Sequence, residues 1–286
     1  MLSVEPTQAP SEVIPLRDPH ETERLGPYLR DVRRRWPYIW YNARSELRRQ
    51  QVNTVFGNLW LLINPALTVA IFYLIFGLLL QVDRGVDNLL LFLAVGIFVF
   101  RATQQATTSG SKAVVNNEGL IRSIHFPRLV LPLTATLAET LATTLSFLVV
   151  FVVAVATGVA PSLTWLVLVP IVALQTVFNF GAGTIAARVT THFRDTTQLL
   201  PFAFRLLFYG SGVIFNVTAY AEGRRWIEIL FALNPMYCFI SMARWTMLGG
   251  SDVTPLVIAS SIIWSIALAV GGFFWFRAGE ANYARS

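Results

Sequence analysis

Long runs of apolar residues constrain this chain more than any other feature of its sequence. Runs of about 20 residues, the length that crosses a bilayer as a helix, lie at 59–80, 130–158, 163–187, 199–217 and 253–276. Only 13% of the 286 residues are charged, compared with about 25% in a typical soluble protein. These runs predict an integral membrane protein and exclude a soluble domain.

A sixth span is expected at 89–100, although this run holds too few apolar residues to cross a bilayer alone. The helix must continue through a polar segment that begins at Arg101 and reaches Ser109. Unpaired polar groups are costly in lipid, so we expect this span to face a partner helix or a polar passage. The sequence therefore predicts an all-α, polytopic membrane protein with six transmembrane helices.

Two further regions flank these spans. Residues 218–252 hold an apolar stretch broken at Asn234-Pro235, and each half is too short to span, which predicts two re-entrant helices before the last span. The proline-rich, acidic residues 1–29 are predicted to be a disordered cytoplasmic tail. Residues 30–56 are predicted to form an amphipathic interface helix, and residues 57–286 the six-helix transmembrane domain.

The predicted interface helix combines arginines with aromatic residues. Trp36, Trp40, Ala43 and Leu47 recur at helical spacing and should share one face. A basic helix with an aromatic face lies in the membrane interface, where its arginines orient the chain or bind a lipid phosphate or pyrophosphate. The candidates for phosphate binding are Arg33, Arg34, Arg35, Arg44, Arg48 and Arg49.

Charged residues also occur inside the predicted spans. Glu139 lies in the third span and Arg205 in the fifth. A carboxylate at the centre of a membrane helix costs about 2.5–3.5 kcal/mol on insertion scales, which makes Glu139 a functional candidate. The alternatives are a structural pair with Arg101 or Arg205, or a position near the lipid headgroups. The pair Gly181-x-Gly183 in the fourth span predicts a close helix contact.

Two polar inserts separate the spans on one side of the membrane. Residues 116–128 read NNEGLIRSIHFPR, which predicts a loop with a short helix that ends at Phe126, because Pro127 disfavours helical geometry in the residue before it. Residues 188–198 form the second insert, in which Asp195 is expected to cap the following helix. Of the 22 Lys and Arg residues, 18 lie on the side of the inserts and both termini. The positive-inside rule therefore places that side in the cytoplasm.

The sequence lacks the patterns of several enzyme classes. It has no phosphate-binding G-x-x-x-x-G-K-[ST] loop and no H-E-x-x-H or C-x-x-C pattern. Cys238 is the only cysteine and His192 has no partner in the pattern, so no metal site is predicted. Enzymatic activity and a cofactor in this chain are not expected.

Three motifs in order resemble the membrane subunit of type-2 ABC exporters. They read NEGLIRSIHFPRLVLPL at 117–133, THFRDTTQLLPFAFRLLFYGSGVIF at 191–215 and ALNPMYCFISMAR at 232–244. The resemblance covers roughly residues 30–277. It is closest to the branch that exports lipid-linked polysaccharides such as O-antigen, teichoic acid and mycobacterial galactan. The proline-rich tail before Leu25 is outside this pattern.

The resemblance implies a homodimer bound to two copies of a separate ATPase subunit, which holds ATP and Mg²⁺. It implies a polyprenyl-pyrophosphate-linked glycan as substrate and a passage lined by the first and fifth spans, where aromatic rings either stack on sugars or pack between helices. The candidate lining residues are Trp60, Phe72, Tyr73, Phe76, Phe202, Phe208 and Tyr209. The ATPase would act on Glu118, Arg122, His125, Phe126, Arg194 and Asp195.

Three other functions compete with this interpretation. A drug or small-amphiphile exporter of the same superfamily would not need the arginine-rich interface helix. A membrane-bound glycosyltransferase or prenyltransferase would need acidic metal ligands, for which the two inserts offer only Glu118 and Asp195. A channel without a partner is the third, and stable co-purification with an ATPase would tell strongly against it.

Overall fold

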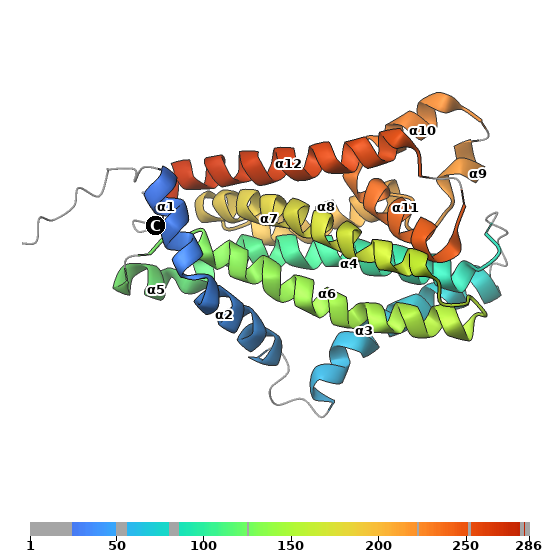
Figure 1. Cartoon of the computed structure of the whole chain (residues 1–286), viewed down its shortest axis with the longest axis horizontal. Helices are drawn as coiled ribbons and strands as arrows, with labels where there is room; N and C mark the ends of the chain where they lie inside the picture. The colour runs from blue at the N-terminus through green and yellow to red at the C-terminus, as the bar shows by residue number, and fades with distance from the viewer. Residues whose placement is uncertain are drawn as a thin grey trace, which may run out of the picture.

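The computed structural model describes residues 25–49, 56–79, 86–124, 126–221, 223–250, 253–280 and 283 (Figure 1). Every regular element within this part of the chain is helical, which confirms the predicted all-α class. The α-helices are α1 (Leu25–Arg34), α2 (Trp36–Arg49), α3 (Trp60–Tyr73), α4 (Leu89–Lys112), α5 (Glu118–Ser123), α6 (Val130–Ala156), α7 (Leu168–His192), α8 (Thr196–Gly210), α9 (Val217–Ala221), α10 (Arg225–Ala232), α11 (Pro235–Leu248) and α12 (Pro255–Ala278). Short helices extend this order: η1 (Gly57–Leu59), the π-helical η2 (Leu74–Leu79), η3 (Val115–Asn117) and η4 (Leu163–Val167).

The long helices lie roughly side by side and give the molecule two ends (Figure 1). We call the end that carries α1, α5 and the turn between α7 and α8 the basal end, and the end that carries α9, α10 and α11 the distal end. Within the described ranges, five helical segments are long and apolar enough to cross a membrane, or six if the bent pair α10–α11 counts as one span. The prediction of a polytopic membrane chain is therefore confirmed.

Helix α4 is the centre of the packing. It contacts α3, α6, α7, α8 and α11, and every residue from Leu91 to Phe100 is buried. Polar residues continue the helix beyond this run, and of these Thr103 and Thr107 are buried whereas Gln105 is exposed. Gln175 of α7, for example, donates a hydrogen bond to the Thr103 hydroxyl over 2.9 Å. The prediction that the half-polar second span faces other helices is confirmed.

The glycine pair of the fourth span marks two close helix contacts, as predicted. A methyl group added to Gly181 would overlap the backbone of Leu268 in α12. Gly183 lies against Gly110 of α4, whose own added methyl group would lie 2.7 Å from the Gly183 Cα. Small residues thus let α7 approach α12 on one side and α4 on the other.

The predicted fifth span is wrong at its end. Helix α8 ends at Gly210 rather than at residue 217, and its 15 residues extend only about 22 Å, less than the hydrocarbon thickness. Gly212 has a φ of 64°, a left-handed conformation that favours glycine and breaks a helix. The chain turns here and continues into α9.

The predicted break at Asn234-Pro235 is confirmed. Helices α10 and α11 meet there at 97°. The Asn234 side chain accepts a hydrogen bond from the Met236 N–H and donates to the Gly210 carbonyl. Pro235 suits the first turn of α11 because its missing N–H would have no intrahelical partner there. Helix α11 is buried almost throughout, against α4, α7 and α12.

The N-terminal region differs from the predicted single helix over 30–56. The helical structure begins at Leu25, within the residues predicted to be disordered, and it is divided at Arg35 into α1 and α2. Pro37 explains the division, since proline is tolerated in the first turn of a new helix but not in a helix interior. Residues 1–24 and 50–55 lie outside the described residues.

Candidate functional site

The two polar inserts meet at the basal end. Glu118 of α5 pairs with Arg194 of the second insert over 3.1 Å and with Arg122, one turn along α5, over 3.8 Å. Both arginine side chains are more than 60% exposed, so the pairs add only about 0–1 kcal/mol each to stability. They join two segments that are far apart in the sequence into one charged, exposed surface.

The remaining residues predicted to contact an ATPase are placed differently. Phe126 is buried beneath the Arg35 guanidinium, whose carbon lies 5.9 Å from the ring centre, and it packs in a small apolar core with Tyr28 and Ile121. The helix α5 ends at Ser123, before the predicted Phe126, because Ile124 is already extended. His125 lies outside the described residues.

Asp195 does precede α8, but the prediction that its side chain caps the helix is wrong. The residue has helical backbone angles and its side chain makes no capping hydrogen bond. Its backbone carbonyl accepts hydrogen bonds from Gln198 and Leu199 instead. The Asp195 side chain is therefore exposed beside the Glu118–Arg194 pair.

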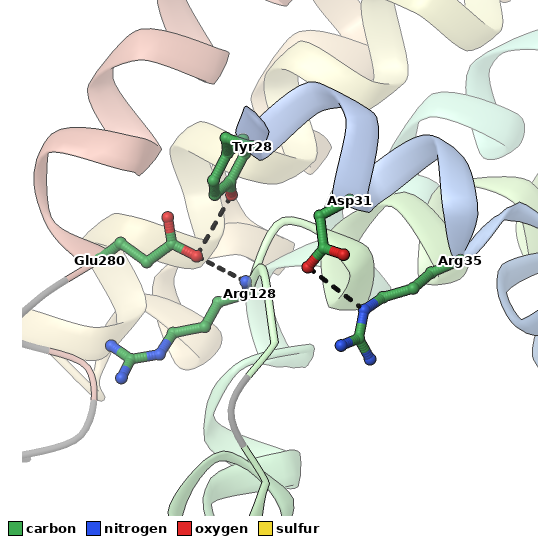
Figure 2. Close-up of polar contacts among 5 residues, drawn as sticks. All are labelled: Tyr28, Asp31, Arg35, Arg128 and Glu280. Atoms are coloured by element: carbon green, nitrogen blue, oxygen red, sulfur yellow. Dashed lines mark hydrogen bonds and ion pairs between the residues drawn. The ribbon is translucent and has the colours of Figure 1, made fainter. Parts of the chain in front are cut away.

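A half-buried carboxyl group, which the sequence did not reveal, joins three segments at the basal end (Figure 2). Glu280, just after α12, accepts a hydrogen bond from the Tyr28 hydroxyl over 3.2 Å and one from the Arg128 backbone N–H over 2.5 Å. It thereby connects the C-terminal end of α12 to α1 and to the loop that follows α5. The Arg277 guanidinium carbon lies 5.1 Å from the centre of the Tyr28 ring.

Burial dominates the ionisation of this cluster. It raises the pKa of Glu280 above its usual value, an effect opposed by the hydrogen bonds from Arg128 and Tyr28. Burial likewise raises the pKa of the Tyr28 hydroxyl, with the Glu280 charge acting in the same direction. A raised carboxyl pKa means that the folded state favours the protonated form of Glu280 more than the unfolded chain does.

The arginines of the interface region lie along an exposed surface. Arg33, Arg34 and Arg44 are exposed, and the Arg44 guanidinium stacks on the Trp40 ring at 4.9 Å. Arg35 is half-buried and forms an ion pair with Asp31 over 3.7 Å (Figure 2). The side chains of Arg48 and Arg49 lie outside the described residues.

The face of the interface region that packs on the protein is not the aromatic face that the spacing indicated. Its buried residues are Tyr28, Val32, Ile39 and Ala43, whereas Trp36 is 48% exposed. Helix α2 lies along α6 with this face. Its aromatic residues are therefore largely turned outward, as in a helix that contacts the membrane interface.

Most of the predicted lining aromatics gather where α3, η2 and α8 meet. The ring centres of Phe72 and Phe76 lie 5.9 Å apart, those of Phe72 and Phe208 5.5 Å, and those of Phe208 and Tyr209 5.6 Å. Tyr209 is exposed and Phe208 half-buried, so the cluster has a packed side and an accessible side.

The other three predicted lining aromatics lie apart from the contacts between Phe72, Phe76, Phe208 and Tyr209. Tyr73 packs at the edge of the main core, and Trp60 pairs with Phe56 at the start of α3 with 5.7 Å between ring centres. Phe202 is 65% exposed on α8. The first and fifth predicted spans therefore touch at Phe72 and Phe208, with aromatic residues distributed along both.

The charged residues of the spans have distinct partners. The Glu139 carboxylate accepts a hydrogen bond from the Ser109 hydroxyl over 2.6 Å, and Glu139 is buried. Arg101 instead donates to the Thr68 hydroxyl over 2.7 Å. Arg205 is exposed, with its guanidinium carbon 5.7 Å from the centre of the Phe202 ring. Arg101 thus contacts Thr68, and Arg205 contacts Phe202.

Arg244 is a buried residue whose importance the sequence analysis missed. Its guanidinium donates to the carbonyls of Gly212 and Val213 over 2.8 and 2.6 Å and to that of Phe92 over 3.2 Å. It lies against Gly96, where an added methyl group would be 2.5 Å from its Nη2. An arginine directly after a long apolar run is the sequence signal that could have indicated this buried role.

Comparison with known proteins identifies the class. Residues 37–248 match the ABC-2 type transporter family, and because this is most of the chain, the chain belongs to that family. An O-antigen export system permease protein RfbA from Klebsiella pneumoniae is 28% identical over 241 residues, covering 82% of this chain and 91% of the relative. A protein of the same name from Myxococcus xanthus is 27% identical over 197 residues, covering 68% of this chain and 74% of the relative.

Proposed function

We propose that this chain is the permease subunit of an ATP-driven exporter that moves a polyprenyl-pyrophosphate-linked polysaccharide across the cytoplasmic membrane. The observation that carries the proposal is the similarity to O-antigen export permeases over 82% of the chain. The exposed arginines of α1 and α2 agree with it, because guanidinium groups bind phosphate in a bidentate manner. The polysaccharide would be of the O-antigen or galactan type.

The proposed assembly is a homodimer with two copies of a separate ATPase subunit, which binds ATP and Mg²⁺. A two-fold dimer can line a wide passage between its subunits. The Glu118–Arg194 surface at the basal end is the proposed docking site for the ATPase, since it joins both polar inserts in one exposed patch. Arg122 and Asp195 border the same patch, and His125 belongs to the first insert.

The proposed orientation places the basal end and both termini in the cytoplasm. The charge distribution supports it, because 16 of the 22 Lys and Arg residues belong to that side even when Arg101 and Arg205, which lie within spans, are left out. In this orientation α1 and α2 contact the inner leaflet, where lipid-linked precursors arrive.

The proposed cycle begins when Arg44, Arg48 and Arg49 meet the pyrophosphate of the substrate. Closure of the ATPase dimer moves α5 and the turn before α8. Movement of α8 separates it from α3, with which it shares the contact between Phe72 and Phe208. The glycan then passes outward along the aromatic residues of both helices, which stack on sugar rings without reading their sequence.

Depletion of this chain in its native cell tests the proposal. We expect a long polyprenyl-linked glycan to accumulate on the cytoplasmic side while its surface product disappears, as measured by lipid extraction and glycan analysis. Normal glycan together with altered sensitivity to small amphiphiles would instead support a drug exporter. Replacement of both Arg48 and Arg49 by Ala should reduce export without impairing co-purification of the ATPase. Unchanged export in that variant would remove the headgroup role of these arginines.

A further inference from the structure

A small polar cavity lies between α3, α4 and α6, apart from the arginines of the interface region. Its volume is about 150 Å³, enough for several water molecules. The polar groups of its lining come from Asn64, Arg101, Gln105, Thr143 and Ser146, with the Trp60 ring beside them. The lining therefore offers amide, hydroxyl and guanidinium donors, and among its described residues it holds one cation and no carboxylate.

The cavity lies deep in the membrane domain. Arg101 is near the middle of α4, about 17 Å from either end of the helix at 1.5 Å per residue. A charged side chain at this depth is costly unless it is paired or reaches a polar compartment. An anionic ligand beside Arg101 would offset this cost.

Arg244, which is buried, and Arg101, which is half-buried, differ in how their donors are used. Arg244 has hydrogen bonds to the carbonyls of Phe92, Gly212 and Val213, so it is held by the protein backbone. Within the described residues, Arg101 has one hydrogen bond, to the neutral Thr68 hydroxyl. Because a guanidinium carries five N–H donors, Arg101 retains donors for a ligand in the cavity.

Glu139 does not supply the missing negative charge in the cavity. It lies one turn from Thr143 on α6, but it is not among the lining residues and accepts a hydrogen bond from Ser109. The cavity wall formed by α3 is the least covered of the three, since only 11% of the span at Leu62–Leu79 is buried. Most of α3 is therefore open to lipid, the side from which a lipid-borne group would reach the cavity.

We propose that this cavity is an intramembrane phosphate-binding site, in which Arg101 binds the phosphate of a lipid through its free donors. Asn64, Gln105 and Thr143 would add hydrogen bonds from amide and hydroxyl groups. On the proposed function, on which this identification rests, the phosphate is the pyrophosphate of the lipid-linked glycan halfway through its passage. A phospholipid of the bilayer carries the same chemistry, so the experiment separates the two sources.

The test uses the chain in complex with its ATPase subunit, purified in a maltoside detergent that contains no phosphate. Native mass spectrometry measures the binding of a polyprenyl pyrophosphate, of phosphatidylglycerol and of a polyprenol without phosphate. Loss of a hydrogen bond to a charged group costs about 1.5–3 kcal/mol. We therefore expect Arg101→Gln to weaken the binding of polyprenyl pyrophosphate about 10-fold to 100-fold. Polyprenol binding should not change, and Arg101→Lys should restore part of the affinity.

Arg225→Gln is the matched control, because Arg225 is exposed on α10 far from the cavity. Equal weakening of phosphatidylglycerol by Arg101→Gln would assign the site to a bilayer lipid. Unchanged affinity for both phosphate lipids would overturn the proposal. If the Arg101→Gln variant does not assemble with the ATPase, the same binding measurements are made on Gln105→Leu and Thr143→Val. Each should lower the affinity for the pyrophosphate lipid about threefold to tenfold.

This outcome is separable from that of the proposed function. If reconstituted wild-type complex exports lipid-linked glycan but Arg101→Gln binds phosphate lipids normally, the function stands and the site does not. If the wild-type complex exports no glycan while Arg101→Gln still loses phosphatidylglycerol binding, the site stands and the function does not.

Discussion

Helices α3 and α4 both have the length and composition of membrane spans, yet they occupy opposite environments. In the span that contains α3, 11% of the residues are buried within the molecule, whereas in α4 the share is 72%. The more apolar helix is the exposed one, and the helix that carries Arg101, Gln104 and Gln105 is the central one. In water the reverse order holds, because the hydrophobic effect covers apolar surface first.

The difference shows what organises this molecule. Lipid tails solvate apolar side chains as well as the protein interior does, so apolarity alone gives a helix no reason to be central. Polar groups have no such alternative partner in lipid, and they gather where other helices satisfy them. The bond from the Gln175 amide to the Thr103 hydroxyl on α4 is an example.

The largest expected effect on stability comes from removing the hydrogen bonds of Arg244, one of which reaches the distal half of α4. Arg244→Leu removes the donor that three backbone carbonyls share, and each buried acceptor left without a partner costs about 1–3 kcal/mol. We expect no stable folded protein after detergent extraction, as measured by size-exclusion chromatography. Arg225→Leu, at an exposed position, should behave like the wild type. A well-folded Arg244→Leu variant would contradict the central role assigned to α4.

The next effect compares α4 and α3 directly. Leu93 is fully buried on α4 and Ile71 is 57% exposed on α3. Leu93→Ala should destabilise the chain by about 2–4 kcal/mol through the cavity that it leaves, and Ile71→Ala by under about 0.5 kcal/mol. Unfolding in mixed micelles with increasing SDS measures both. An equal loss at Ile71 would show that α3 is covered by another chain, such as the second copy of the proposed dimer.

A smaller effect is expected where α7 contacts its neighbours. Gly181→Ala would force α7 away from the Leu268 backbone, and we expect a cost of about 1–3 kcal/mol for the overpacked contact. Gly183→Ala is the matched control, because its added methyl group would meet its nearest atoms at 3.6 Å, an ordinary contact distance. In the same SDS titration, the Gly181→Ala variant should be clearly less stable to unfolding than the Gly183→Ala variant. The reverse ranking would place the tight approach on the α4 side of α7.

The smallest effect extends the comparison to a half-buried carboxyl group outside the spans, that of Glu280. Because the pKa of Glu280 is raised in the folded state, its contribution is fully present below the unfolded carboxyl pKa and is lost as pH rises through the folded value. The contact between α1 and the end of α12 should therefore exchange amide hydrogens faster as the pH rises above about 4.5, after correction for intrinsic exchange. Glu280→Gln should abolish this pH dependence, and its persistence would assign the effect to another group.

Much of this arrangement could be predicted from the sequence because its signals are local. Long apolar runs predicted the membrane spans, Gly181-x-Gly183 predicted close helix contacts, and Asn234-Pro235 predicted the break between α10 and α11. Each depends on residues that are adjacent along the chain. The polar composition of α4 also predicted that this span faces a partner helix or a polar passage, since lipid offers polar groups no alternative.

The errors came from interactions between distant segments. Helix α8 ends at Gly210, where the next carbonyls accept hydrogen bonds from Arg244, more than 30 residues later. The buried face of α1 and α2 is set by contacts with α6 and with the end of α12, which periodicity cannot reveal. Glu280 was overlooked because its partners Tyr28 and Arg128 lie 252 and 152 residues away.

The bent pair α10–α11 has a consequence for the order in which the chain is assembled during synthesis. Helix α11, with 14 residues, is only about 21 Å long, so it is a poor candidate for insertion as an independent span. Its buried surface contacts α4, α7 and also α12, which the ribosome produces later. Helix α11 therefore completes its contacts only after α12 has entered the membrane, which makes the last part of its docking a late step in biogenesis.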